Sequence, residues 1–388
     1  MLSQRLQLLA PSPTLSLDSK VKTMQAQGIS IVNLGLGEPD FPTPNTAKQG
    51  AINALENNFT HYTAVPGIVE LRQAIASKLA KENHISYTPE EIVVGVGTKQ
   101  LLYHSFQVLC NPGDEVLVPT PTWSTYIEQI KLSGAIPVII PLKTPFKLRA
   151  VDIQKYFTPK TKAIILNSPS NPTGATIDLI ELQKIAELAV KHNFWVISDE
   201  IYEKIIYDGK HTSIASLNPQ IKNRTITING FSKAYAMTGW RIGYAAGPKE
   251  IIAGFTALQG QTTSNTSSIS QHAALAALQG SQSTVKKMCR QFAQRRKLVL
   301  AELAKCASLE VLNPEGAFYV FISIKKLLNK NYPTSTAWCQ ALLEEAHVAV
   351  VPGEAFEAPG FFRLSFAASP AQLKIGLASI KKFCERMK

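Results

Sequence analysis

Short apolar runs rich in β-branched residues recur along the chain and alternate with segments in which apolar residues return every three or four positions. The first pattern predicts buried strands, and the second predicts amphipathic helices. Their alternation is typical of an α/β fold with a mostly parallel sheet. We predict a seven-stranded sheet with strands at residues 92–96, 115–118, 136–140, 163–166, 195–198, 225–228 and 241–246.

A helix is predicted before the strand at 195–198, because apolar residues recur there at helical spacing. These residues are Leu179, Leu182, Ile185, Ala186 and Ala189. Asp178 and Glu181 stand at the start of this run with the spacing of a capping box. We expect the helix to begin with that box and to cover one face of the sheet.

The pattern changes after about residue 280. A long helix bearing lysines and arginines is followed by the apolar run 316–324, a further helix, and the short runs 348–353 and 361–366. This predicts a smaller α+β domain over residues 281–388, after a large domain over residues 46–280. The densest basic set lies on the long helix, where we expect a solvated face: Lys286, Lys287, Arg290, Arg295, Arg296 and Lys297.

Composition places the chain among large folded proteins. Its 388 residues are 45% hydrophobic and 18% charged, which allows a large core divided among more than one domain. Five scattered cysteines without a CxxC pair argue against a disulfide framework or a structural zinc site. The N-terminal segment has Arg5 and no uninterrupted apolar core, and no later run approaches membrane-spanning length. We therefore expect a cytoplasmic protein with no metal site and no membrane association.

The net charge of +12 raises the question of a nucleic-acid partner. The basic residues are spread along the chain, however, and they show no interleaving with aromatic residues and no recognisable nucleic-acid-binding module. We predict no nucleic-acid binding. A mild positive field instead favours small dianionic substrates.

Candidate chemistry centres on Lys233 in the segment GFSKAYAMTGWRIGY (230–244), eight positions before Arg241. A lysine amine can condense with an aldehyde, and an arginine can hold a phosphate. Pyridoxal 5′-phosphate (PLP) requires both kinds of group. This pair therefore makes PLP the candidate cofactor.

Asp199 and Tyr202 follow directly after the predicted strand at 195–198, where an α/β sheet presents its ligand-binding groups. A carboxylate beside a pyridine nitrogen keeps that nitrogen protonated, so that the ring can withdraw electrons from the substrate α-carbon. A phenol three positions later can donate a hydrogen bond to the ring hydroxyl oxygen. We assign these roles to Asp199 and Tyr202 respectively.

Two further segments offer ligands for such a cofactor. Asn171 begins the turn NPTG and presents a side-chain amide that can hold the ring oxygen and a substrate carboxylate. In EIVVGVGTKQ, a strand passes into a helix through Gly97 and Thr98, which leaves free backbone donors for a phosphate. Gly95 and Gly97 also hint at a dinucleotide fingerprint, but its third glycine is missing.

In their order along the chain, NPTG, SDEIY and SKAYAMTGWR resemble the fold-type-I PLP aminotransferases of class I, specifically the branch of bacterial aspartate aminotransferases. The resemblance extends from residue 11 to residue 369. It implies that Lys233 forms the Schiff base with PLP, that Asp199 pairs with the ring nitrogen, and that Asn171 and Tyr202 hold the ring oxygen. It further implies that a second set contacts the phosphate, namely Gly97, Thr98, Lys99, Ser232 and Arg241.

The same resemblance assigns the substrate side of the site. It implies that Trp123 stacks on the ring and borders the substrate, that the backbone of Gly37 approaches the substrate carboxylate, and that Arg363 grips the α-carboxylate beside Asn171. A lysine at the position of Lys99 faces the distal carboxylate in the aspartate branch. Transamination of L-aspartate with 2-oxoglutarate is therefore the expected reaction.

Assembly is also implied by the resemblance. Tyr62 matches a tyrosine that reaches the phosphate of the neighbouring subunit's cofactor, which implies a homodimer with shared active sites. Residues 1–45 are expected to form an N-terminal arm and to pack with the small domain. Gly230 departs from the pattern, since many relatives carry a phosphate-binding serine there.

Three alternatives stay open at this point. The first is an aminotransferase that prefers aromatic donors, prephenate or alanine. The second is a PLP lyase that eliminates groups from amino acids. The third, of another class, is a PLP-sensing regulator, which would need a DNA-binding module for which no residues remain.

Overall fold

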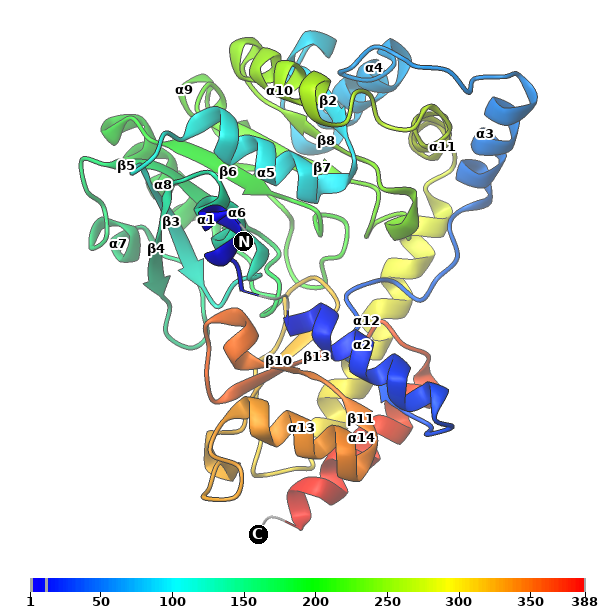
Figure 1. Cartoon of the computed structure of the whole chain (residues 1–388), viewed down its shortest axis with the longest axis vertical. Coiled ribbons are helices and arrows are strands. Elements are labelled where there is room, and N and C mark those ends of the chain that lie inside the picture. Colours follow the sequence, from blue (N-terminus) through cyan, green and yellow to red (C-terminus); the bar gives the residue numbers. More distant parts are fainter. Residues whose placement is uncertain (1–2, 11–12, 387–388) are drawn as a thin grey trace.

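The computed structural model of the chain describes residues 3–10 and 13–386, and its main feature is a seven-stranded sheet (Figure 1). The strand order is β2-β8-β7-β6-β5-β3-β4. Strand β8 is antiparallel to both of its neighbours, and the other pairs are parallel. The strands are β2 (Ile92–Gly95), β3 (Glu115–Thr120), β4 (Ile136–Pro141), β5 (Thr161–Asn167), β6 (Trp195–Asp199), β7 (Thr225–Gly230) and β8 (Gly243–Ala246).

All seven predicted strands are present, and the α/β fold class with a mostly parallel sheet is confirmed. The main shift concerns β8, which begins at Gly243 rather than at residue 241. Arg241 has a φ of 51°, a left-handed conformation that a strand does not accommodate. The chain therefore turns at Arg241 before it enters the sheet.

Both faces of the large sheet are covered by helices, and alternate side chains of strands such as β3 and β5 enter different cores. Val116 and Val118 pack with α5, α6 and α10, whereas Leu117 packs with α7 and α8 on the other face. Ile92 and Val94 join a third core, with α3, α4 and α11. With α9, whose Ile221 joins the core of α7 and α8, the helices of this region are α3 (Asn45–Glu56), α4 (Val69–Lys78), α5 (Gly97–Leu109), α6 (Thr125–Leu132), α7 (Ala150–Gln154), α8 (Leu179–His192), α9 (Pro219–Lys222), α10 (Lys249–Thr262) and α11 (Ser268–Gln279).

The helix predicted before β6 is α8, but the predicted capping box does not form. Asp178 precedes the helix without a capping hydrogen bond, and its carboxylate accepts instead from Lys147 at 2.8 Å. Glu181 accepts from the backbone N–H of Ala150, at the start of α7, also at 2.8 Å. The prediction was wrong because tertiary partners captured both side chains.

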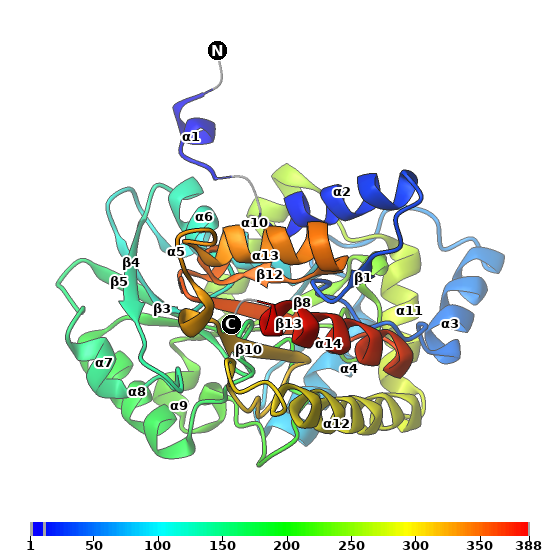
Figure 2. The same cartoon turned by 90° about the horizontal axis from the view of Figure 1, so that it is seen from below.

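A second region contains a four-stranded sheet with the order β12-β13-β10-β9. Its helices are α12 (Ser283–Leu303), α13 (Ser335–Ala346) and α14 (Pro370–Glu385), and Figure 2 shows them gathered around this sheet. In Figure 1, α12 runs from beside α11 down into this region. The strands are β9 (Glu310–Val311), β10 (Tyr319–Ser323), β12 (Val351–Pro352) and β13 (Phe361–Ser365).

The N-terminal part of the chain contacts this second region and, at its start, the large-sheet region. Strand β1 (Val32–Asn33) pairs in parallel with β11 (Val348–Ala349), and α2 (Pro13–Ala26) is connected through the Lys20–Glu344 ion pair to α13. The short α1 (Gln4–Gln7) is followed by Ala10, whose N–H donates to Glu128 of α6 at 3.0 Å. The domain boundaries at residues 45 and 280 stay a prediction.

Two of the basic residues on α12 differ from the expectation of a solvated face. Arg295 is buried and forms a bidentate pair with Asp40 at 2.6 and 3.0 Å, and Arg296 is buried and pairs with Asp208. Lys286, Lys287 and the remaining basic positions of the set are exposed. Within residues 3–10 and 13–386, none of the helices combines the length and apolar character that a membrane crossing requires.

Candidate active site

A cavity of about 640 Å³ lies where the carboxyl ends of β5 and β6 face the second region. Its wall includes all of the predicted site residues except Gly97 and Tyr62. Parallel strands β5 and β6 end at the same edge of the sheet, which is why residues distant in sequence meet there. The predicted residues along the wall are Gly37, Thr98, Lys99, Trp123, Asn171, Asp199, Tyr202, Ser232, Lys233, Arg241 and Arg363.

Asp199 is the last residue of β6 and is 2% exposed. Its Oδ2 accepts a 2.7 Å hydrogen bond from the Tyr126 hydroxyl, and its Oδ1 accepts from the backbone N–H of Ile201 at 3.2 Å. Burial raises the pKa of Asp199 to about 6, against the opposing effect of these hydrogen bonds. Two hydrogen bonds therefore fix the position of the carboxylate, and its pKa lies about one unit below neutral pH.

Lys233 follows β7, the parallel neighbour of β6, and is also part of the cavity wall. Its Nζ donates to the backbone carbonyl of Gly37 and lies 6.0 Å from the centre of the Tyr202 ring. Removal from bulk water lowers the pKa of the Lys233 amine to about 8, although the nearby Glu38 carboxylate opposes that shift. This lowered pKa increases the fraction of the amine that is neutral and nucleophilic near physiological pH.

Tyr202 lies beside the amine and is 4% exposed. Its hydroxyl is 2.9 Å from the hydroxyl of Tyr319 in β10, so the two phenols share a hydrogen bond. Burial raises the pKa of Tyr202 well above its ordinary value, which keeps its proton available for donation. The pair connects the large sheet to the second region.

Arg363 of β13 is 2% exposed and spans the gap between the two sheets. Its Nη1 donates to the Asn171 side-chain oxygen and its Nη2 donates to the Gly35 carbonyl, both at 2.8 Å. The guanidinium carbon lies 4.3 Å from the centre of the Tyr319 ring. The buried Nε has no hydrogen-bond partner among the described residues. This donor set can hold a carboxylate.

A second cationic part of the cavity forms where α5 begins. Gly97 has a φ of +73°, and a Cβ there would lie 2.8 Å from Nη2 of Arg241, so glycine is required for this approach. The Arg241 Nη1 donates to the Thr238 carbonyl at 2.9 Å. Free N–H groups at the start of α5 and this guanidinium together favour an anion such as a phosphate.

Lys99 lies on the first turn of α5 and contacts Trp123. Its Nζ is 4.8 Å from the centre of the indole ring. Burial lowers the pKa of Lys99, and the nearby Arg241 lowers it further. The ammonium and the indole therefore border the same part of the cavity.

Three residues that the sequence analysis missed complete the inner part of the site. Tyr126 and Tyr319 provide the hydroxyl groups next to Asp199 and Tyr202. Asn167 donates from Nδ2 to the Asp199 carbonyl at 3.1 Å and accepts from the Asn171 N–H at 2.8 Å. The sequence does show Asn167 at the end of a predicted strand and Tyr126 three positions after Trp123. Neither position, however, indicates a contact with Asp199.

Tyr62 lies outside the cavity wall and is 90% exposed. At this exposure, the ring of Tyr62 is almost unpacked against the described part of the chain. Its predicted contact with a neighbouring subunit stays a prediction.

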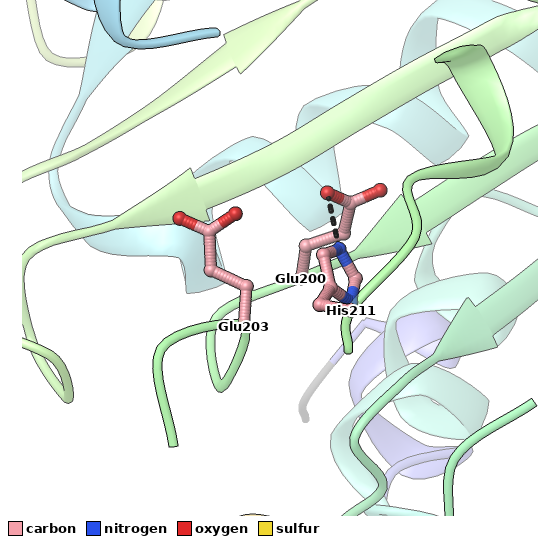
Figure 3. A group of neighbouring side chains, drawn as sticks. All are labelled: Glu200, Glu203 and His211. Atoms are coloured by element: carbon pink, nitrogen blue, oxygen red, sulfur yellow. Dashed lines mark hydrogen bonds and ion pairs between the residues drawn. The ribbon is translucent and has the colours of Figure 1, made fainter. Parts of the chain in front are cut away.

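Another cluster of polar residues begins at Glu200, the residue after Asp199. The side chains of Glu200, Glu203 and His211 have potential metal-ligand atoms within 4.8 Å of one another (Figure 3). The His211 Nε2 lies 2.9 Å from Glu200, and Glu203 is paired with Lys78 and with the Nδ2 of Asn83. The carboxylates therefore already have protein partners.

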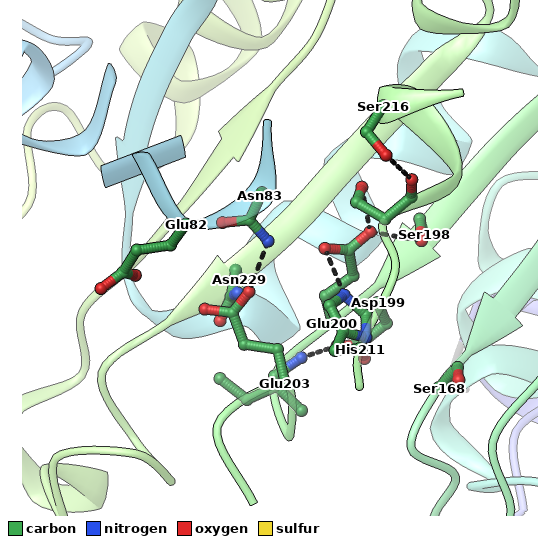
Figure 4. A network of polar contacts seen from close by, with 12 residues as sticks. Glu82, Asn83, Ser168, Ser198, Asp199, Glu200, Glu203, His211, Ser216 and Asn229 are labelled. Carbon is green, nitrogen blue, oxygen red and sulfur yellow. Dashed lines mark hydrogen bonds and ion pairs between the residues drawn. The ribbon is translucent and has the colours of Figure 1, made fainter. Parts of the chain in front are cut away.

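Figure 4 shows how this network extends. Glu200 also accepts from Ser198 at 3.0 Å and from Ser213 at 2.6 Å. Although burial opposes protonation, Glu200 raises the pKa of His211 above its ordinary value. Such a network of ion pairs and hydrogen bonds buttresses the end of β6.

Comparison with known proteins agrees with this geometry. The family described as "Aminotransferase class I and II" matches residues 29–380. The "Probable aspartate/prephenate aminotransferase" of Aquifex aeolicus is 45% identical over 391 residues, covering 100% of this chain and 99% of that protein. The "Aspartate aminotransferase" of Bacillus sp. is 43% identical, covering 99% of both.

Solved structures give the same result. The crystal structure of the aspartate aminotransferase from Rhizobium meliloti has a TM-score of 0.96 at 41% identity, covering 100% of this chain and 99% of that one. The Thermus thermophilus aspartate aminotransferase with maleate has a TM-score of 0.95 at 40% identity, covering 99% of both chains. The fold-type-I architecture predicted from the motifs is confirmed. With family, relatives and fold in agreement over nearly the whole length, the chain belongs to the class I and II aminotransferases.

Proposed function

We propose that this aminotransferase uses PLP to transfer the amino group of L-aspartate to 2-oxoglutarate. The observation that carries the proposal is the convergence of Lys233, Asp199 and Arg363 on one cavity. An amine, a buried carboxylate and a carboxylate-binding guanidinium are the groups that PLP-dependent amino transfer requires.

The residues present fit PLP. Arg241, the N-terminus of α5 and Ser232 offer donors for a phosphate at one end of the cavity, and Asp199 offers a carboxylate at the inner end. Asn171 and Tyr202 offer donors for a ring oxygen, and Trp123 offers an aromatic face. When bound, PLP would supply an electron-withdrawing ring conjugated to the substrate nitrogen.

The protein's own contribution then follows from the geometry. Lys233 is the general base that removes the proton from the substrate α-carbon at its Nζ, and its pKa of about 8 suits that task. Positioned proton transfer of this kind accelerates a reaction by roughly 10²–10⁴-fold. Arg363 fixes the α-carboxylate so that the α-proton faces the amine, and Asn171 orients Arg363.

Substrate choice is inferred from a second cationic group in the cavity wall. Lys99 offers an ammonium for the distal carboxylate of aspartate or 2-oxoglutarate, some distance from the α-carboxylate site at Arg363. Relatives named aspartate aminotransferase support this choice. Others are named probable aspartate/prephenate aminotransferase, so prephenate is the second candidate acceptor.

Assembly and location belong to the same proposal. We infer a homodimer in which the exposed Tyr62 reaches the phosphate of the neighbouring subunit's cofactor. The division into a large domain (46–280) and a small domain built from residues 1–45 and 281–388 is retained, as is a cytoplasmic location.

A half-reaction titration tests the proposal. The PLP-loaded protein is mixed with single amino acids, and the loss of the cofactor's absorbance is followed without a keto acid. Aspartate and glutamate should convert the cofactor at lower concentration than alanine or phenylalanine. A protein that gains no PLP absorbance, or that releases pyruvate or ammonia without a keto acceptor, would contradict the proposal.

A further inference from the structure

The Asp199 carboxylate is enclosed by protein and takes one hydrogen bond at each oxygen. Tyr126 donates to Oδ2 at 2.7 Å, and the backbone N–H of Ile201 donates to Oδ1 at 3.2 Å. Neither donor carries a positive charge. A buried carboxylate with two neutral donors depends strongly on each of them.

The side chain of Tyr126 is buried, and its packing holds the hydroxyl at the Asp199 carboxylate. It lies on the first turn of α6, is 1% exposed, and its hydroxyl crosses from α6 to the end of β6. The ring meets Trp123 edge-on, with centroids 5.5 Å apart and an interplanar angle of 83°. Packing therefore fixes the phenol before any ligand enters.

The neighbouring carboxylate of Glu200 has hydrogen-bond partners other than Tyr126. It is engaged by Ser198, Ser213 and His211. Within the part of the chain that the structure describes, Tyr126 is the side-chain donor to the Asp199 carboxylate.

A phenol O–H bound to a carboxylate stabilises the charged form relative to the protonated form. Burial acts in the opposite direction and raises the pKa of Asp199 to about 6. Loss of the phenol would therefore raise this pKa further and leave Oδ2 without its donor.

We propose that Tyr126 is a positioning residue that keeps the Asp199 carboxylate ionised and aimed into the cavity, where it serves as the anionic partner of the cofactor's pyridine nitrogen. This inference rests on the proposed function. It adds a residue whose role is exerted through Asp199 and not through contact with the reacting atoms.

The first test compares wild type with Tyr126→Phe, which removes only the hydroxyl. PLP affinity of the apoprotein is measured by absorbance titration as a function of pH. Because hydrogen bonds to charged groups are among the stronger ones, we expect affinity to fall about tenfold near pH 6 and less at higher pH. The acid limb of the kcat/KM profile should move to higher pH in the same variant.

A matched control is Tyr332→Phe. The Tyr332 hydroxyl also donates to a carboxylate, that of Glu345 at 3.3 Å, but outside the cavity. This control should leave PLP affinity and the pH profile unchanged. If Tyr126 served packing alone, Tyr126→Phe would keep the packed ring and would move neither PLP affinity nor the pH profile, and the proposal would be overturned.

Incorporation of 3-fluorotyrosine at position 126 provides a second test that keeps the hydroxyl in place. The fluorinated phenol is more acidic and donates a stronger hydrogen bond, so the acid limb should move to lower pH. Opposite shifts for 3-fluorotyrosine and phenylalanine support the inference, and an unmoved limb with 3-fluorotyrosine overturns it. If wild-type protein fails to bind PLP at all, the proposed function itself fails.

Discussion

Arg363 and Asn171 lie 192 positions apart in the chain, and the Arg363 guanidinium donates a 2.8 Å hydrogen bond to the Asn171 side-chain oxygen. The bond connects β13 of the small sheet to the turn that follows β5 of the large sheet. A carboxylate that binds Arg363 therefore binds at a point fixed by both sheets.

Arg363→Lys should weaken every α-amino acid and keto acid substrate. A lysine cannot donate in parallel to a carboxylate while also reaching Asn171 and Gly35. We expect KM to rise by about 10- to 100-fold, the effect of losing one hydrogen bond to a charged group. Steady-state kinetics measure it, with Arg149→Lys as control, because Arg149 is an exposed arginine paired with Asp152. An unchanged KM would exclude Arg363 from carboxylate binding.

Much of the fold was predictable because most strands of the large sheet are buried on both faces and therefore appear as short apolar runs. Asp199 was predictable as a polar residue directly after such a run. The link between Tyr126 and Asp199 was not, because 73 positions separate the two and neither helical nor strand periodicity relates them.

Local signals failed where a tertiary partner competed with them. The capping box at Asp178 and Glu181 matches the expected spacing, but Lys147 and the Ala150 N–H are better placed. Arg295 resembles a solvated helix residue until the fold brings Asp40 beside it. The information needed for these contacts lies in other parts of the chain.

Gly97→Ala should weaken PLP binding. A methyl group at this position would lie 2.8 Å from Nη2 of Arg241 and would displace the guanidinium. The positive φ adds a conformational cost of about 1–2 kcal/mol. We expect the dissociation constant for PLP to rise at least about tenfold, because a charge-assisted phosphate contact is lost.

The control for this variant is Gly113→Ala. Gly113 has a φ of +89° and no heavy atom within 4 Å of an added Cβ, so it carries the same backbone cost without the contact. Both variants should lose stability, and only Gly97→Ala should lose PLP affinity in an absorbance titration. Equal affinities would show that Arg241 is not displaced.

Lys99→Ala should change substrate preference. Removal of the ammonium takes a charged partner from the distal carboxylate, so KM for aspartate and 2-oxoglutarate should rise about tenfold or more. Alanine lacks a distal carboxylate, and its kcat/KM should be unaffected. The exposed Lys160→Ala serves as control. A proportional loss for aspartate and alanine would rule out a distal-carboxylate role.

Glu203→Gln should destabilise the protein by about 3 kcal/mol near neutral pH, because it removes the shortest ion pair of the buried Lys78 and leaves the longer contact with Glu82 at 3.7 Å. Although burial opposes the shift, Lys78 and His211 lower the pKa of Glu203 to about 2. The carboxylate therefore stabilises the native state above its unfolded pKa of about 4.5, and this contribution is lost as pH falls from about 4.5 to about 2.

Urea unfolding at several pH values measures this effect. The stability gap between wild type and Glu203→Gln should narrow as pH falls through that window. Glu302→Gln removes a more exposed pair with Lys305 and should change stability by less than about 1 kcal/mol. A gap that stays constant down to pH 2 would argue against the Lys78–Glu203 pair as its source.

The most direct test of the central claim is borohydride reduction of the PLP-loaded protein, followed by peptide mapping with mass spectrometry. The account predicts one pyridoxyl label, on the peptide that carries Lys233, and no such label in Lys233→Ala. A label on another lysine, or no label on any peptide, would contradict the assignment of Lys233 as the residue that binds the cofactor.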